Sequence, residues 1–258
     1  MKKRTMLYFG SFNPIHKGHI ALAEYVLQCG LCDCVVLVVS PLNPLKNEDS
    51  LLPELTRFEM AEAACLKSGY PTQIMPSAVE FLLDKPSYTI NTLRFLEENN
   101  GGEMQFSILM GADNIENFHK WKEADTILAG YDIYVYPRAG YSSDKYDGRV
   151  HFLADAPLFE CSSTAIRNAL RNGEDASEWL SKEVIDYIKA HNLFPNCSNE
   201  TSQLKEEGRA HFRKNEWGNA LNAFRKTTAL NPDDTEALEY IKMIEEILAF
   251  RYKDIYNP

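Results

Sequence analysis

Residues 5–39 read TMLYFGSFNPIHKGHIALAEYVLQCGLCDCVVLVV, and this stretch decides the fold. Its first apolar run ends at Gly10, which is typical of a short buried strand. Apolar residues then recur at helical spacing over residues 18–29. Residues 34–39 are a β-branched run without polar alternation, as expected of a central parallel strand that is covered on both faces. Strand, helix and strand within about 35 residues predict a βαβ unit.

The alternation of short apolar runs and amphipathic segments continues for most of the chain. We expect further strands at 73–75, 105–110, 132–136 and 150–153, and helices at 55–67, 89–98, 121–128, 163–170 and 182–190. This order predicts an α/β fold with a doubly wound parallel sheet. Ligands of such sheets bind beyond the carboxyl ends of the strands.

Composition and charge exclude several classes of protein. The 258 residues are 45% hydrophobic and 25% charged, and the formal net charge is -10, which disfavours a nucleic-acid-binding protein. No stretch has the 18 or so apolar residues of a membrane span, and the apolar run after Met1–Arg4 is too short for a signal peptide. A cytoplasmic protein is therefore expected. Cys29, Cys32 and Cys34 have no second metal-ligand pair at a familiar spacing, which favours buried reduced thiols over a metal or redox site.

The turn after the first strand has the features of a phosphate site. Gly10, Ser11 and Phe12 follow the strand directly, and a small residue there allows close approach of the backbone to a phosphate. The next helix starts near Gly18, and the N–H groups and dipole of a helix N-terminus attract anions. His16 and His19 add two side-chain donors. There are two alternatives: the two histidines could bind zinc, or they could be ordinary residues at the start of a helix without a functional role.

Residues 10–19, GSFNPIHKGH, resemble the signature of the HxGH nucleotidylyltransferase superfamily. Residues 161–167, CSSTAIR, resemble its second ATP motif, in which Ser162, Ser163, Thr164 and Arg167 would cradle the β- and γ-phosphates. A Ser/Thr run before a helix is more often only a cap, but its pairing with the first motif favours the ATP role. Within the superfamily, residues 1–194 resemble bacterial nicotinate mononucleotide adenylyltransferases.

The resemblance to that family assigns the remaining site residues. Residues 86–93, PSYTINTL, place Tyr88 and Thr89 at a helix start that would receive the nicotinate carboxylate, and Trp121 would stack on the pyridine ring. Gly111 would belong to the ATP site, Asp113 would accept from the hydroxyls of the adenylate ribose, and Lys46 would add charge near the triphosphate. Ser11 and Asn13 depart mildly from the family pattern, and Asn13 is assigned to the substrate side. The local alternatives are a helix cap for Tyr88 with Thr89 and for Asp113, a core position for Trp121 and a solvated loop for Lys46.

The implied reaction joins ATP and nicotinate mononucleotide to give deamido-NAD and pyrophosphate. The acceptor phosphate is already ionised near neutral pH, so positioning and electrostatics should supply most of the rate. His16, His19 and Arg167 are assigned to the charge of the transition state and of pyrophosphate. Mg²⁺ should accompany ATP, held mainly by substrate oxygens and water. Nicotinamide mononucleotide and phosphopantetheine are the alternative acceptors.

Beyond a polar linker at 195–202, residues 203–258 predict helices only. Leu204, Gly208, Ala220, Phe224 and Pro232 match positions of a tetratricopeptide repeat, and a last helix is expected from Thr235 to about Lys253. One repeat cannot bury both of its faces, so it should pack on the catalytic domain or on a second subunit of a homo-oligomer. The alternative is a protein-interaction module that binds a peptide partner.

Overall fold

The computed structural model describes residues 2–41, 51–138, 140–141, 146 and 148–253. The chain divides into two compact units. The first contains residues 1–163 and 179–187, and the second contains residues 164–178 and 188–258. The second unit therefore includes a segment that precedes the expected boundary at residue 194, and the division into a catalytic domain and an extension stays a prediction.

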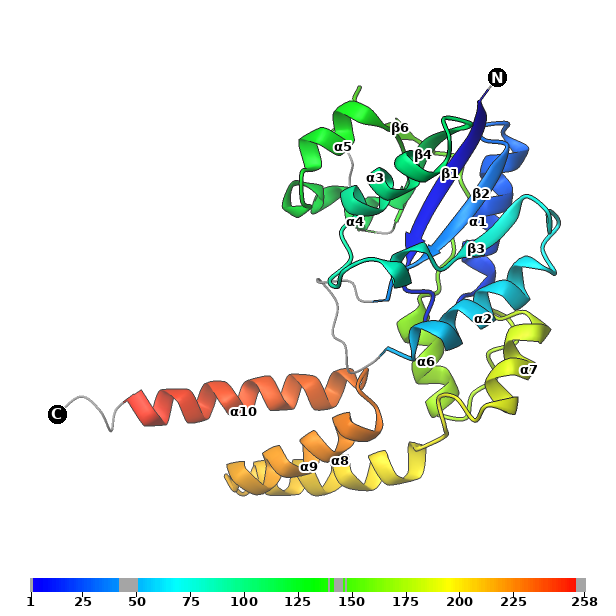
Figure 1. Ribbon diagram of the computed structural model, residues 1–258. Helices are drawn as coiled ribbons and strands as arrows, with labels where there is room; N and C mark the ends of the chain where they lie inside the picture. The colour runs from blue at the N-terminus through cyan, green and yellow to red at the C-terminus, as the bar shows by residue number, and fades with distance from the viewer. Residues whose placement is uncertain (1, 42–50, 139, 142–145, 147, 254–258) are drawn as a thin grey trace. The chain divides into compact units, whose positions relative to one another are not determined.

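The first unit is built on a six-stranded parallel sheet (Figure 1). Its strands are β1 (Lys3–Gly10), β2 (Cys34–Val39), β3 (Ile74–Ser77), β4 (Met104–Gly111), β5 (Asp132–Tyr136) and β6 (His151–Phe152). The order in space is β3-β2-β1-β4-β5-β6, and every pair is parallel. The predicted doubly wound sheet is confirmed. The strand order reverses between β1 and β4, which is where such folds bind ligands.

Helices cover both faces of this sheet, with α1 on one side and α3 on the other (Figure 1). The helices that lie wholly or mostly in the first unit are α1 (Lys17–Gln28), α2 (Glu54–Cys65), α3 (Thr89–Asn99), α4 (Ala112–Glu116), α5 (Ala124–Gly130) and α7 (Lys182–Ala190), with short 3-10 helices η2 (Val79–Leu82) and η3 (Phe118–Lys120). The helix α6 (Ser163–Arg171) belongs almost wholly to the second unit. The helix expected from residue 121 starts three residues later. Glu123 has a φ of 54°, and this left-handed conformation separates Trp121 from α5. Trp121 thus lies in extended backbone after η3.

The core between the sheet and the α3 side is apolar and fully covered. Leu93, Ile108, Phe118, Ile127 and Ile133 are all completely buried there. Each such side chain contributes about 1.5–3 kcal/mol through burial. This packing fixes the carboxyl ends of β1 and β4 relative to the start of α3, and those are the elements that carry the predicted site.

The C-terminal helices of the second unit are α8 (Ser198–Arg213), α9 (Trp217–Leu230) and α10 (Thr235–Lys253). The bounds expected for the last helix are thus confirmed. Phe224 is fully buried, and its ring stacks on Tyr240 of α10 with 4.5 Å between the ring centroids. A Cβ atom on Gly208 would lie 2.8 Å from the Phe224 ring, so α8 and α9 pack closely at this glycine. A helical pair followed by a third helix is compatible with a tetratricopeptide-like repeat, which stays a prediction.

None of the helices in the described part of the chain is long and apolar enough to span a bilayer. Cys32 and Cys34 are buried, and burial raises the pKa of the Cys32 thiol to about 12, as expected of inert core thiols. The expectation of a buried thiol is wrong for Cys29, which is the C-cap residue of α1 and is exposed.

Candidate active site

The turn after β1 is held by a buried aromatic ring. Phe12 has a φ of 45° and is 2% exposed, and a Cβ atom on Gly10 would lie 2.8 Å from its ring. Gly10 is therefore required by the packing of Phe12, whereas the sequence suggested that its small size serves a phosphate. Because the Phe12 side chain is covered, only its backbone could reach a nucleotide.

His16 and His19 form one unit at the start of α1. His16 is the N-cap residue, and its backbone N–H donates to Nδ1 of His19 at 3.1 Å. The two rings are 3.7 Å apart between centroids. A ring nitrogen that accepts carries no proton, so the proton of neutral His19 lies on Nε2. Gly18 is also tied to this unit, since a Cβ atom there would lie 3.0 Å from the His16 ring.

The electrostatics of His16 differ from those of an exposed histidine. Burial, followed by the positive charge of Arg138, lowers the pKa of His16 to about 4. The imidazole is therefore neutral near pH 7 and can act as a hydrogen-bond donor, but it brings no positive charge. Sγ of Cys161, the first residue of the second motif, lies 3.9 Å from Nδ1 of His16.

Arg57 of α2 is a positioning residue that the sequence did not reveal. It is 1% exposed, and its guanidinium donates to the carbonyl oxygens of Ser11 at 2.6 Å and Ser40 at 2.7 Å. It also donates to the carbonyls of Leu52 and Pro41, both at 2.9 Å. Burial lowers the pKa of Arg57 to about 10, so it stays charged near pH 7. Arg57 thereby joins the segments that follow β1 and β2.

Two predicted site residues have structural contacts within the same region. Asn13 is 1% exposed, and its Oδ1 accepts from the backbone N–H of Leu52 at 3.2 Å. Ser163 Oγ donates to the carbonyl of Pro14 at 3.0 Å, which joins the second motif to the first. Asn13 therefore shapes the loop, and the geometry gives no direct support to its assignment as a substrate ligand.

A cavity of about 330 Å³ brings most of the predicted acceptor residues together. Its lining includes Gly10 at the end of β1 and Ser11 after it, Tyr88 and Thr89 at the start of α3, and Trp121. Tyr88 is the N-cap residue of α3, so the cavity is lined at the end of the helix where N–H groups lack partners within the helix. The Trp121 ring packs on Phe118, with 5.2 Å between ring centroids. The cavity thus combines an aromatic face with a helix N-terminus.

Glu80 of η2 also lines this cavity, although no motif or pattern in the sequence marked it. It is 1% exposed, and its Oε1 accepts from the Thr92 hydroxyl at 2.8 Å. Among the described residues, Oε2 of Glu80 and Oγ of Ser87 are buried without a geometric hydrogen-bond partner. Burial raises the pKa of Glu80, and neighbouring hydroxyls offset only part of that effect. Glu80 therefore ties η2 to Thr92 of α3 at the edge of the cavity.

Asp113 follows the end of β4 and faces a cation. A Cβ atom on Gly111 would lie 2.3 Å from Asp113 Oδ1, so the carboxylate folds back over this glycine. Arg138 Nε lies 3.6 Å from the same oxygen, and its guanidinium lies 5.6 Å from the centre of the Tyr136 ring. Arg138 was not singled out in the sequence. Its positive charge helps to lower the pKa of His16.

The second motif extends into the second compact unit. Ser162 precedes α6, and Thr164 Oγ1 accepts from Arg167 Nη2 at 3.1 Å. Arg167 is buried, and Nε and Nη2 donate to the carboxylate of Asp233. Lys46 lies outside the described residues. The phosphate roles of these residues stay predictions.

No cluster of three or more His, Cys, Asp or Glu side chains that could hold a metal ion occurs in the described ranges.

Comparisons with known proteins agree with this architecture. The cytidylyltransferase-like family matches residues 7–169. A probable nicotinate-nucleotide adenylyltransferase of Flavobacterium johnsoniae is 39% identical over 191 residues, which are 73% of this chain and 97% of that protein. A probable nicotinate-nucleotide adenylyltransferase of Bacteroides fragilis is 42% identical, over 72% of this chain and 92% of that protein.

Solved structures show the same fold at lower identity. The nicotinic acid mononucleotide adenylyltransferase of Plasmodium falciparum, complexed with NaAD, is 20% identical, with a TM-score of 0.65 over 74% of this chain and 97% of that one. The remainder of the present chain lies outside these matches. On the sequence matches, over nearly the full length of the relatives, the chain belongs to the nicotinate-nucleotide adenylyltransferase family within the cytidylyltransferase-like proteins.

Proposed function

We propose that this chain joins ATP and nicotinate mononucleotide to give deamido-NAD and pyrophosphate. The observation that carries the proposal is the cavity that unites the turn after β1 with Tyr88, Thr89 and Trp121. A planar aromatic ring and a helix N-terminus are suited to a ligand that is itself flat, aromatic and anionic. Nicotinate mononucleotide has that chemistry, and the turn after β1 belongs to the motif assigned to ATP.

In the proposed reaction, a phosphate oxygen of the mononucleotide attacks the α-phosphorus of ATP. The bond from that phosphorus to the bridging oxygen breaks, and pyrophosphate leaves with the electron pair. No general base is needed, because the attacking phosphate is largely ionised. The protein must bring two anions together and stabilise the charge that develops on the leaving oxygen.

Hydrogen bonding and positive charge are supplied by different residues in this proposal. His16 is neutral, and His19 carries its proton on Nε2, so the pair would donate hydrogen bonds to phosphate oxygens. Arg138 lies near enough to His16 to depress its pKa, and it would supply positive charge beside that pair. Ser162, Ser163, Thr164 and Arg167 keep the role toward the β- and γ-phosphates that the motif assigns.

On the acceptor side, Trp121 would stack on the pyridine ring, and the first N–H groups of α3 would bind the nicotinate carboxylate. Asp113 would accept from the hydroxyls of the adenylate ribose. Mg²⁺, when bound with ATP, would neutralise phosphate charge and hold the phosphates in one geometry. A cytoplasmic location and a homo-oligomer or peptide contact through the C-terminal helices remain part of the proposal.

A competition assay tests the choice of acceptor. The purified chain is supplied with ATP and equal concentrations of nicotinate mononucleotide and nicotinamide mononucleotide, and the two dinucleotide products are separated by chromatography. We expect deamido-NAD to form faster, because the helix N-terminus favours the carboxylate over the neutral amide. Faster formation of NAD would contradict the assignment. Phosphopantetheine, which has no aromatic ring for Trp121, is the negative control.

A further inference from the structure

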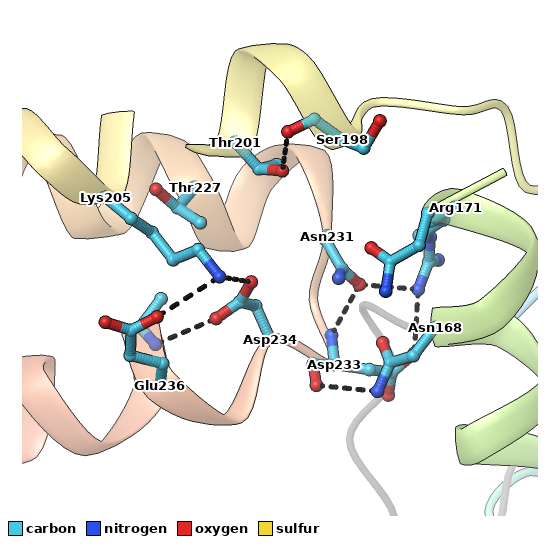
Figure 2. Close-up of polar contacts among 12 residues, drawn as sticks. Asn168, Arg171, Ser198, Thr201, Lys205, Thr227, Asn231, Asp233, Asp234 and Glu236 are labelled. Atoms are coloured by element: carbon cyan, nitrogen blue, oxygen red, sulfur yellow. Dashed lines mark hydrogen bonds and ion pairs between the residues drawn. The ribbon is translucent and has the colours of Figure 1, made fainter. Parts of the chain in front are cut away.

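An acidic residue in a turn between two C-terminal helices binds the arginine of the second ATP motif. Asp233 lies in the turn between α9 and α10, beside Asn168 and Arg171 of α6 (Figure 2). Arg167 donates from Nε to Asp233 Oδ2 at 2.7 Å and from Nη2 to Oδ1 at 2.6 Å. This is the bidentate geometry by which a guanidinium binds a carboxylate or a phosphate.

A second arginine shares the same carboxylate. Arg171 Nη1 donates to Asp233 Oδ2 at 2.8 Å and to Asn231 Oδ1 at 2.9 Å. Asn168 Nδ2 donates to the backbone carbonyl of Asp233 at 3.2 Å. Two guanidinium groups and an amide thus converge on one residue. Such a set of donors is also what a phosphate group would require.

The cluster is shielded from water. The side chains of Arg167, Arg171 and Asp233 are exposed by only 7%, 10% and 10%. Burial by itself raises the pKa of Asp233, but hydrogen bonds and charge from both arginines outweigh it, so the pKa is lowered and the carboxylate is ionised near pH 7. The carboxylate therefore neutralises one of two buried positive charges.

Side chains other than that of Asp233 hold the turn in which it lies. Its neighbour Asp234 caps α10, accepting from the N–H of Ala237 at 3.0 Å. Asp234 also pairs with Lys205 of α8 at 3.0 Å, and Lys205 pairs with Glu236 at 3.2 Å (Figure 2). These contacts hold the turn against α8, whereas the carboxylate of Asp233 is directed to the arginines of α6.

We propose that Asp233 competes with the polyphosphate of ATP for Arg167 and so sets the affinity of the chain for ATP. The inference rests on the proposed function, because it takes Arg167 as a phosphate ligand. The carboxylate occupies the guanidinium edge that matches a phosphate best. Removal of its charge leaves Arg167 and Arg171 with one more unit of positive charge to offer a phosphate. Asp233 is an affinity-determining residue that acts through Arg167.

The test compares Asp233→Asn and Asp233→Glu in the full chain. The dissociation constant of a non-hydrolysable ATP analogue with Mg²⁺ is measured by calorimetry, and the KM for ATP is measured with nicotinate mononucleotide. D233N should bind the analogue about tenfold more tightly and lower the KM for ATP, the effect of roughly one charge-assisted hydrogen bond. D233E keeps the carboxylate and should resemble the wild type. Glu245→Gln removes a charge from the exposed Arg225 pair and is the matched control.

Unchanged or weaker binding by D233N, relative to E245Q, would overturn the inference, and weaker binding would instead make Asp233 a support for Arg167. Should D233N fail to fold, hydrogen exchange in the wild type decides the matter. The analogue should speed exchange of the N–H groups of residues 231–237, and unchanged or slower exchange would contradict displacement. If the wild type binds the analogue but forms no deamido-NAD, the proposed acceptor fails while the competition at Arg167 is still tested by binding.

Discussion

Acidification should destabilise this protein through His16. The pKa of His16 is lowered to about 4 by burial and by Arg138, whereas a histidine in the unfolded chain titrates near 6.5. Between these values the unfolded chain binds a proton that the folded chain does not. Stability therefore falls as the pH is lowered through this window, and the full contribution of the neutral imidazole is present above pH 6.5 or so.

The size of this loss of stability follows from the difference between the pH and the pKa of histidine in the unfolded chain. At pH 5 the proton is favoured in the unfolded chain by about 1.5 pH units, which corresponds to about 2 kcal/mol. Urea unfolding between pH 5 and 7.5 measures the free energy of unfolding at each pH. His16→Gln cannot take up the proton, so the pH dependence of its stability should lose about one proton compared with the wild type.

The comparison uses the slope with pH rather than the absolute stability, because H16Q also perturbs the start of α1. His119→Gln removes an exposed histidine and is the matched control. Equal pH dependence in H16Q and the wild type would refute the reasoning, since it would mean that His16 takes up its proton alike in both states.

Three further outcomes are expected. Trp121→Ala should raise the KM for nicotinate mononucleotide about tenfold to a hundredfold with little change in the KM for ATP, since ring stacking contributes roughly 1–3 kcal/mol. Steady-state kinetics measures both constants, and an equal rise in the two would indicate a core role for Trp121. Arg57→Met leaves four carbonyls without their donor and should lower the free energy of unfolding, measured by urea unfolding, by at least about 3 kcal/mol. A loss below about 1 kcal/mol would contradict the positioning role of Arg57. Deletion of residues 203–258 removes the anion from two buried arginines and should lower the thermal midpoint; unchanged stability, oligomeric state and activity would exclude a packing role.

Sequence patterns were sufficient for the parallel sheet and most of its helices. Buried parallel strands are continuous apolar runs, so residues 34–39 marked β2 with the bounds that the structure shows. The start of α5 was missed because the break depends on the left-handed conformation of Glu123, which no local pattern announces. Contacts between segments that are distant in the sequence could not be predicted either, because no local pattern marks them.

The same limit applies to the candidate site. Tyr88, Thr89 and Trp121 were found through motif resemblance, and the structure brings them to one cavity. Arg57 and Glu80 are single charged residues on helices, and only their burial among distant carbonyls and hydroxyls reveals what they do. Their positions in the sequence look like ordinary polar sites on a helix surface.

The central claim is that the cavity accepts nicotinate mononucleotide for adenylyl transfer from ATP. The most direct measurement is the identification, by mass spectrometry, of the products that the purified chain forms from these two substrates with Mg²⁺. Deamido-NAD and pyrophosphate should appear in equal amounts, and His19→Ala should abolish most of the turnover while the chain stays folded. Absence of deamido-NAD from a folded chain that is supplied with both substrates would contradict the claim.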